Sequence, residues 1–414
     1  MLYKNFGVKS IYKLLTAGNH MFIKKFEKCE IFAFITFIFS VTVFIWFSLL
    51  CGMQGTFHWH KEGLLIYLIF FILLFSPVAL SIINHFKPNK FTHNFLIIIS
   101  ILGLIFYCTL FLTLSILSSV KINRNGLDII DINSPLPVSE IKQTDKEENL
   151  IAHYAFTSDP HWGSSTSNAE ARKQILKQID SNNYDCLFLL GDISEVGIIP
   201  GIYKTAIKDI SENLSHTKLR AIPGNHDALI NGLPLFKSCF MNKNDKFYFR
   251  MDNGTIHFIF LNILWDRAEF SKKQEKWLIN QLESIPQEDT VIVISHCYIT
   301  GSGFWDKFAQ RNWGDIPDVI NRLCPILEKY NVDLSLSGHN HFFEYLEKEN
   351  VSYAVLGTMG GKLDENLIYS SPYSKWINNE AFGWLDMKIY DSHLDLTFYE
   401  KSGTELYRTQ IKTK

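Results

Sequence analysis

The chain has 414 residues, of which 47% are hydrophobic and 20% are charged, and its formal net charge is −2. Residues 1–149 carry more basic than acidic side chains and residues 150–414 carry more acidic ones, which excludes the broad basic surface of a general nucleic-acid-binding protein. We therefore expect no stable nucleic-acid binding, and the lack of repeats or low-complexity segments excludes a largely disordered chain.

Three apolar segments without a charged side chain lie in the first third of the chain, at residues 31–51, 64–83 and 95–117. Each has about the 20 residues that a helix needs to cross roughly 30 Å of hydrocarbon. Core helices of globular domains seldom run this long without a polar face, and a cleaved signal peptide is not followed by two further segments of this kind. The sequence therefore predicts three transmembrane helices within residues 31–117, preceded by a basic N-terminus at residues 1–30.

Lysine and arginine counts beside these segments predict the orientation of the chain. Six lysines precede the first segment, whereas the loop that follows it contains only Lys61, and the second loop contains Lys87 and Lys90. Because short loops rich in lysine and arginine stay in the cytoplasm, we expect a cytoplasmic N-terminus. Everything after Leu117 is then expected to be extracytoplasmic, in an integral membrane protein.

Residues 118–149 are polar and contain prolines, and we interpret them as a linker. In residues 150–414, short apolar strands alternate with helical segments, which predicts an α/β domain with a layered sheet and helices on its faces. Strands are expected at 151–157, 186–190, 218–222, 247–251, 256–262, 291–295, 333–337, 342–346, 353–356, 384–390, 394–399 and 406–411, and helices at 169–179, 203–213, 272–282 and 317–330.

Polar side chains follow five of the expected strands, where open α/β sheets place their sites. A single aspartate after a strand is more often a helix cap, but polar residues after five strands predict one shared site. Oxygen and imidazole donors suit Mn²⁺, Fe or Zn²⁺, and seven donors with one shared carboxylate suffice for two ions. Neighbouring glycines are expected to let the backbone turn sharply. The side chains are Asp159 and His161, Asp192, Asn225 and His226, His296, and His339 and His341.

The five clusters read D-x-H, G-D, G-N-H-D, H and G-H-x-H in this order, and they resemble the calcineurin-like metallophosphoesterase superfamily over residues 150–356. Within it, residues 191–197 and 261–282 resemble the branch that contains class III cyclic-nucleotide phosphodiesterases, from which Cys297 departs. The resemblance implies the metallophosphoesterase fold, a layered β-sandwich flanked by helices, for residues 150–414.

The resemblance also implies a role for each polar residue. His226 would donate a proton to the leaving oxygen, with Asp227 orienting its ring. Two divalent ions would lie side by side and share the carboxylate of Asp192. One ion would be held by Asp159, His161 and His341, and the other by Asn225, His296 and His339.

We expect from these features a dinuclear metal-dependent hydrolysis of a phosphomonoester or phosphodiester, by a hydroxide that bridges the metals, at the outer side of a membrane. A site tethered to a bilayer favours a lipid-linked or envelope-associated phosphoester as the substrate. The alternative is a non-catalytic sensory module on a membrane anchor that binds metal or phosphate without turnover. His226 argues against this alternative, because a binding site alone has no need of that residue.

Overall fold

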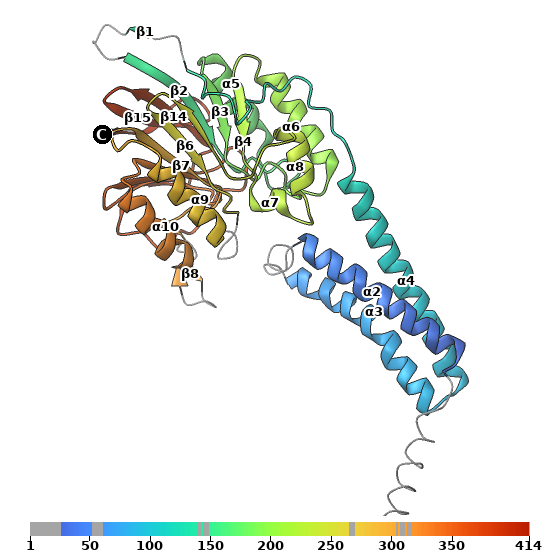
Figure 1. The fold of residues 1–414 in the computed structure, drawn as a ribbon. Coiled ribbons are helices and arrows are strands. Elements are labelled where there is room, and N and C mark those ends of the chain that lie inside the picture. Colours follow the sequence, from blue (N-terminus) through green and yellow to red (C-terminus); the bar gives the residue numbers. More distant parts are fainter. Residues whose placement is uncertain are drawn as a thin grey trace, which may run out of the picture. The chain divides into compact units, whose positions relative to one another are not determined.

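The computed structural model describes residues 26–51, 61–138, 142–143, 149–264, 270–303, 305–306, 311–312 and 317–413. Most of the expected basic N-terminus, residues 1–25, lies outside this set. The chain divides into two compact units, Met1–Ile116 and Leu117–Lys414 (Figure 1).

Within its described residues, the smaller unit contains three helices, α2 (Lys28–Cys51), α3 (Lys61–Phe86) and α4 (Lys90–Ser118). All three are long and apolar enough to cross a membrane, which agrees with the three predicted segments. Many apolar side chains on them are exposed, including Ile35 at 60% and Ile105 at 57%. Such exposure is unfavourable in water and is expected for side chains that face lipid.

Close packing holds the three helices together. A Cβ atom on Gly103 of α4 would lie 3.2 Å from the carbonyl oxygen of Leu73 in α3, so this position suits a small residue. Tyr107 is fully buried, and its hydroxyl donates a hydrogen bond of 2.9 Å to the carbonyl oxygen of Phe70. This bond gives the Tyr107 hydroxyl a hydrogen-bond partner in apolar surroundings, where no water is present to provide one.

The larger unit contains two seven-stranded sheets. The first sheet has the order β16-β15-β14-β2-β3-β4, in which β2, β3 and β4 are parallel. Its strands are β16 (Glu405–Lys412), β15 (His393–Glu400), β14 (Gly383–Tyr390), β2 (Asn149–Thr157), β3 (Cys186–Leu189), β4 (Lys218–Ala221) and β1 (Lys142–Gln143), which pairs with β2.

The second sheet has the order β13-β11-β12-β10-β7-β6-β5, with β6, β7, β10 and β12 parallel. A separate pair is formed by β8 (Trp305–Asp306) and β9 (Arg311–Asn312). The strands of the second sheet are β13 (Ser374–Asn378), β11 (Phe343–Lys348), β12 (Val351–Leu356), β10 (Leu334–Ser337), β7 (Thr290–Ile294), β6 (Ile256–Phe260) and β5 (Phe249–Asn253).

Helices cover the outer face of each sheet (Figure 1). A buried core between the sheets includes Phe156, Phe188 and Phe258, whose rings pack together. The four layers confirm the predicted β-sandwich flanked by helices. The helices are α5 (Ala169–Ser181), α6 (Pro200–Asn213) and α8 (Leu233–Phe240) on the first sheet, α9 (Lys272–Glu283) and α10 (Pro317–Lys329) on the second, and the short α7 (Asn225–Ala228) after β4.

Local sequence signals explain where these helices begin. The Asn168 side chain accepts a hydrogen bond of 3.0 Å from the backbone N–H of Ala171 and caps α5. Ser271 caps α9 by accepting one of 3.2 Å from Gln274. Side-chain oxygens at this position satisfy N–H groups that the first turn leaves unpaired.

Residues 118–138, which we expected to form a linker, pack along the edges of both sheets. Ile130 donates a backbone hydrogen bond of 3.0 Å to Leu219 in β4, and Leu136 donates one of 3.1 Å to Asp252 in β5. The side chains of Ile130 and Leu136 are buried in the core between the sheets. The larger unit thus begins before residue 150, because this segment covers two edge strands that would otherwise expose unpaired backbone groups.

Candidate metal centre

Parallel pairing places the carboxyl ends of five strands at one edge of the sandwich, and the predicted site residues follow these ends. The structure brings all eight of them together, with side chains that range from fully buried to partly exposed. Asp159 and His161 follow β2, Asp192 follows β3, Asn225 and His226 open α7 after β4, His296 follows β7, and His339 and His341 follow β10.

One group of donor atoms surrounds the carboxylate of Asp159. The Nε2 atom of His341 lies 3.4 Å from Asp159 Oδ1 and 3.2 Å from His161 Nε2. His161 Nε2 lies 3.8 Å from Asp159 Oδ1 and 3.5 Å from Asp192 Oδ2. Two imidazole nitrogens and two carboxylate oxygens therefore point into one small space, as the ligands of a divalent cation do.

A second group lies on the other side of Asp192. Its Oδ1 atom is 3.5 Å from His296 Nε2. Asn225 Oδ1 lies 2.9 Å from His296 Nε2 and 2.9 Å from His339 Nδ1. Asp192 thus offers one oxygen to each group, and its role as a bridge between two ions stays a prediction.

The donor set fits two divalent cations. Asp159 Oδ1 is buried and accepts no hydrogen bond from the residues that the structure describes. A buried carboxylate oxygen without a partner is costly, and a cation between Asp159, His161 and His341 would remove this cost. The assignment of each residue to one ion stays a prediction.

Hydrogen bonds on the outer nitrogens of the histidines fix which nitrogen faces inward. His296 Nδ1 donates to the carbonyl oxygen of Leu190 at 2.7 Å, and His341 Nδ1 donates to that of Lys362 at 2.5 Å. Because a carbonyl oxygen only accepts, the neutral rings keep the Nε2 lone pair for a metal. Metal-binding histidines generally have such an outer partner.

Four of the site residues have a left-handed backbone. The φ angles are 53° for Asp159, 47° for His161, 50° for Asp192 and 69° for His339. Residues other than glycine rarely adopt this left-handed backbone region, and those that do are concentrated at functional sites. The strain of the sharp turns is therefore borne mainly by the ligand residues themselves.

The expectation for the neighbouring glycines was correct only in part. Gly191 has a φ of +101°, whereas Gly224 has a φ of −105°, which other residues also adopt. Gly224 is required for space, because a Cβ atom there would lie 2.1 Å from Asp192 Oδ1. Gly338 is also required for space, since a Cβ atom there would lie 1.8 Å from Ser158 Oγ.

We expect Gly224→Ala to lower hydrolytic activity at least about tenfold and stability by about 1–3 kcal/mol, because the new methyl group displaces the Asp192 carboxylate. Gly201→Ala is the matched control, since a Cβ atom at this position in α6 meets nothing within 4 Å. The control should keep the wild-type activity in kinetic assays and the wild-type transition temperature in thermal unfolding. Equal activity of the two variants would contradict the steric account.

Burial and neighbouring charges set the protonation of the site. Burial lowers the pKa of His339 to about 3, and burial with the nearby His161 lowers the pKa of His226 to about 4. Burial also lowers the pKa of His161, but the carboxylates of Asp159 and Glu195 outweigh it and raise this pKa to about 10. Neutral imidazoles are ready ligands, and a cation would replace the proton that His161 holds.

The interpretation of Asp227 as the group that orients His226 was wrong. Asp227 is fully buried, and its carboxylate accepts hydrogen bonds from the backbone of Ile193, Ser194 and Gly224 and from the Tyr203 hydroxyl. His226 Nδ1 instead lies 2.9 Å from the carbonyl oxygen of Glu195. Asp227 holds two ligand loops together because four donors surround it, and the backbone after β3 orients the histidine.

Three features of the site were not found from the sequence. The Glu195 carboxylate lies 2.7 Å from His161 Nδ1 and supplies the outer partner of this ring. The Asp364 carboxylate accepts a hydrogen bond of 2.8 Å from the His341 backbone. Residues 358–361 wrap Asp159, whose carbonyl oxygen accepts from the hydroxyl of Thr358 at 2.6 Å and the backbone of Gly361 at 2.9 Å.

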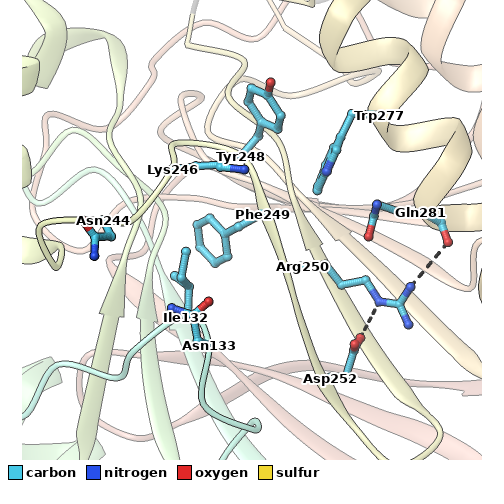
Figure 2. A pocket seen from close by; sticks show the side chains of 10 residues that line it. All are labelled: Ile132, Asn133, Asn244, Lys246, Tyr248, Phe249, Arg250, Asp252, Trp277 and Gln281. Carbon is cyan, nitrogen blue, oxygen red and sulfur yellow. Dashed lines mark hydrogen bonds and ion pairs between the residues drawn. The ribbon is translucent and has the colours of Figure 1, made fainter.

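A separate polar cavity of about 450 Å³ lies along β5 and α9 (Figure 2). Tyr248 and Trp277 stand on its wall with their rings 5.0 Å apart. Arg250 is already neutralised by Asp252 at 2.6 Å and also donates to the carbonyl oxygen of Gln281 at 3.4 Å. The residues that line this cavity include none of the predicted metal ligands, so it is separate from the candidate metal centre.

Comparison with known proteins agrees with this geometry. The family model of the calcineurin-like phosphoesterases matches residues 152–343. Tartrate-resistant acid phosphatase type 5 of Oryctolagus cuniculus is 26% identical over 150 residues, which are 34% of this chain and 43% of that protein. The mouse (Mus musculus) protein of the same name is 24% identical over 285 residues, which are 58% of this chain and 82% of that protein.

A solved structure shares the fold. The purple acid phosphatase PPD1 of yellow lupin (Lupinus luteus) superposes with a TM-score of 0.55 at 16% identity, over 63% of this chain and 53% of that one. The resemblance to the class III phosphodiesterase branch stays a prediction. The family match, the shared fold and the shared-carboxylate geometry agree, and the chain carries a calcineurin-like metallophosphoesterase domain C-terminal to three helices that are long and apolar enough to cross a membrane.

Proposed function

We propose that this protein is a membrane-anchored phosphoesterase that hydrolyses a phosphomonoester or phosphodiester with two divalent cations. The observation that supports this function is the pair of donor groups that share Asp192. Two cations at such a site lower the pKa of water and stabilise the attacking and leaving oxygens of a phosphoryl displacement. Asp159, His161 and His341 would hold one cation, and Asn225, His296 and His339 the other.

His226 is the residue proposed to handle a proton. Its ring centroid lies 4.7 Å from that of His161, and 29% of its side chain is exposed, so it borders the donor groups and remains accessible. Its Nδ1 atom is held by the Glu195 carbonyl oxygen, which directs Nε2 away from that backbone. A bound phosphoryl group brings negative charge, which raises the pKa of the ring and favours the imidazolium that can donate to a leaving oxygen.

We further propose that the domain lies at the outer side of the membrane and acts on a lipid-linked or envelope-associated phosphoester. The lysine-rich N-terminus supports a cytoplasmic start, and an odd number of crossings supports a domain on the opposite side. A site tethered to a bilayer meets substrates in that bilayer more often than dilute soluble ones.

The proposed activity is tested with the purified full chain in detergent, supplied with Mn²⁺ and either a chromogenic aryl phosphate or a bis-aryl phosphate. We expect hydrolysis that stops when a chelator removes the metal and returns when Mn²⁺ is restored. Metal binding without hydrolysis across a broad panel of phosphoesters would instead identify a non-catalytic sensory module.

Replacing His226 by alanine should lower kcat by about 10²–10⁴ because the proton donor is lost, whereas bound metal stays at the wild-type level. The matched control is His216→Ala, since His216 is an exposed histidine of the same domain. Steady-state kinetics and metal analysis distinguish the two effects. A His226→Ala enzyme with the kcat of the control would remove this residue from the mechanism.

The orientation is tested with a reporter joined to Lys414. A reporter enzyme that works only outside the cytoplasm should be active in this fusion. A reporter enzyme that works only inside the cytoplasm should be inactive. Exchanging the lysines before the first helix for neutral residues should weaken this preference. The reverse pattern of reporter activity would place the domain in the cytoplasm.

A further inference from the structure

A second cluster of metal-binding side chains lies outside the phosphoesterase domain, at the end of the helical unit where α2 and α4 begin. Cys29 Sγ lies 3.3 Å from His93 Nδ1 and 3.6 Å from Glu27 Oε2. His93 Nδ1 lies 3.3 Å from the same Glu27 oxygen. The thiol of Cys29 in α2, the imidazole of His93 in α4 and the carboxylate of Glu27, which directly precedes α2, therefore point at a common position.

The three separations fit a tetrahedral cation. Zinc binds sulfur at about 2.3 Å, nitrogen at about 2.0–2.1 Å and carboxylate oxygen at about 2.0–2.2 Å, so neighbouring ligands in a tetrahedron lie about 3.3–3.6 Å apart. The distances between Cys29, His93 and Glu27 are 3.3, 3.6 and 3.3 Å. One ion therefore reaches all three atoms without movement of the helices.

The surroundings hold this cluster in place and leave it accessible. Glu30 is buried, and its carboxylate accepts hydrogen bonds from the Glu27 backbone at 2.9 Å and from the Asn84 amide at 3.1 Å. These bonds fix the start of α2 against the end of α3. Cys29 is buried, whereas the side chains of Glu27 and His93 are 43% and 42% exposed, so the surrounding protein does not enclose the cluster.

We propose that Cys29, His93 and Glu27 bind one zinc-like divalent cation, which ties α2 to α4. A thiolate with an imidazole selects zinc over Mg²⁺ and Ca²⁺, which prefer oxygen ligands alone. The cation binds the deprotonated sulfur, so the Cys29 thiol releases its proton to solvent on binding. With three protein ligands, the fourth tetrahedral position is left to water, which makes the ion exchangeable.

Cobalt provides a direct test, because a thiolate bound to Co²⁺ has a charge-transfer absorption band in the near ultraviolet. The ligands proposed for the catalytic site are all nitrogen and oxygen, so the band is not expected from that site, and the variants described next assign it to a cysteine. The full chain in detergent is stripped of metal and titrated with Co²⁺ and then with Zn²⁺. We expect one saturable band, which Zn²⁺ removes by displacing Co²⁺.

Variants assign the band to these residues. Cys29→Ser should abolish it, and His93→Gln should weaken the affinity for Co²⁺ at least about tenfold, because one of three ligands is lost. Cys108→Ser is the matched control, since Cys108 lies in α4 away from the cluster and should keep the full band. Unchanged phosphoesterase activity and thermal unfolding of Cys29→Ser would show that this variant is folded.

Two results would overturn the proposal. One is a wild-type chain that shows no band at saturating Co²⁺, which would leave only hydrogen bonds between the three side chains. The other is a band that persists in Cys29→Ser. Asp192→Asn keeps the test independent of the phosphoesterase site, because this variant should lose hydrolysis and retain the band.

Discussion

Asp192→Asn is expected to lower kcat/KM by at least about 10³, which corresponds to about 4 kcal/mol of lost transition-state stabilisation. Asp192 presents Oδ2 to His161 Nε2 and Oδ1 to His296 Nε2, each at 3.5 Å. Asparagine has the same shape but replaces one of these oxygens by an NH₂ group, which donates hydrogen bonds and does not bind a cation. The substitution also removes the charge that both ions would share.

Metal analysis separates this effect from unfolding. In the Cys29→Ser background, which lacks the cation proposed at the helical unit, we expect the chain to retain two divalent ions after dialysis. Adding Asp192→Asn should lower this number, while both chains have the same thermal transition. Asp391→Asn, at an exposed aspartate of the same domain, is the control and should keep both ions and full activity. Wild-type kinetics in Asp192→Asn would refute the shared-carboxylate mechanism.

Arg220→Met is expected to lower the free energy of unfolding by about 3–5 kcal/mol, which is typical when one partner of a buried ion pair is removed. Arg220 is fully buried, donates to Asp245 at 2.9 Å and to the carbonyl oxygen of Ile130 at 3.1 Å, and lies over the ring of Phe249. Its replacement leaves the negative charge of Asp245 alone in the protein interior.

The double variant Arg220→Met with Asp245→Leu should lose less stability than the sum of the single changes, by about 0.5–3 kcal/mol, because no unpaired charge remains. Equilibrium unfolding followed by tryptophan fluorescence gives the three values. Lys208→Met is the control, because Lys208 forms an exposed ion pair with Glu212, in which the side chains are 69% and 58% exposed. This substitution should lower the free energy of unfolding by less than about 1 kcal/mol. Additive losses in the double variant would show that the pair is not coupled.

Most of the strands and the three long helices could be predicted because their signals are local. The apolar runs that form α2 and α4 have the length and composition of membrane-spanning helices. The shorter apolar run that forms β7 is buried on both faces, as is typical of a central parallel strand. The gathering of the candidate ligands was also predictable, because parallel strands share the edge at which their carboxyl ends lie. Asp159 and His339 are 180 residues apart, yet a hydrogen bond of 2.8 Å joins them.

Glu195 illustrates what depended on tertiary structure. The loops after β2 and β3 pair through a bridge between Trp162 and Ser194, and this pairing carries the Glu195 carboxylate to His161. Nothing in the local sequence distinguishes this glutamate from an ordinary surface residue.

Residue type and periodicity act over short distances, so the amino-acid sequence was enough to predict candidate ligands and to identify the segments that are apolar enough to span a membrane. The partners of each group depend on the packing of the folded chain, as the four donors around Asp227 and the position of residues 118–138 along both sheet edges show. This packing also brought Cys29 and His93 together across two helices. Such contacts join residues far apart in the chain, and their geometry follows from the packing of whole elements.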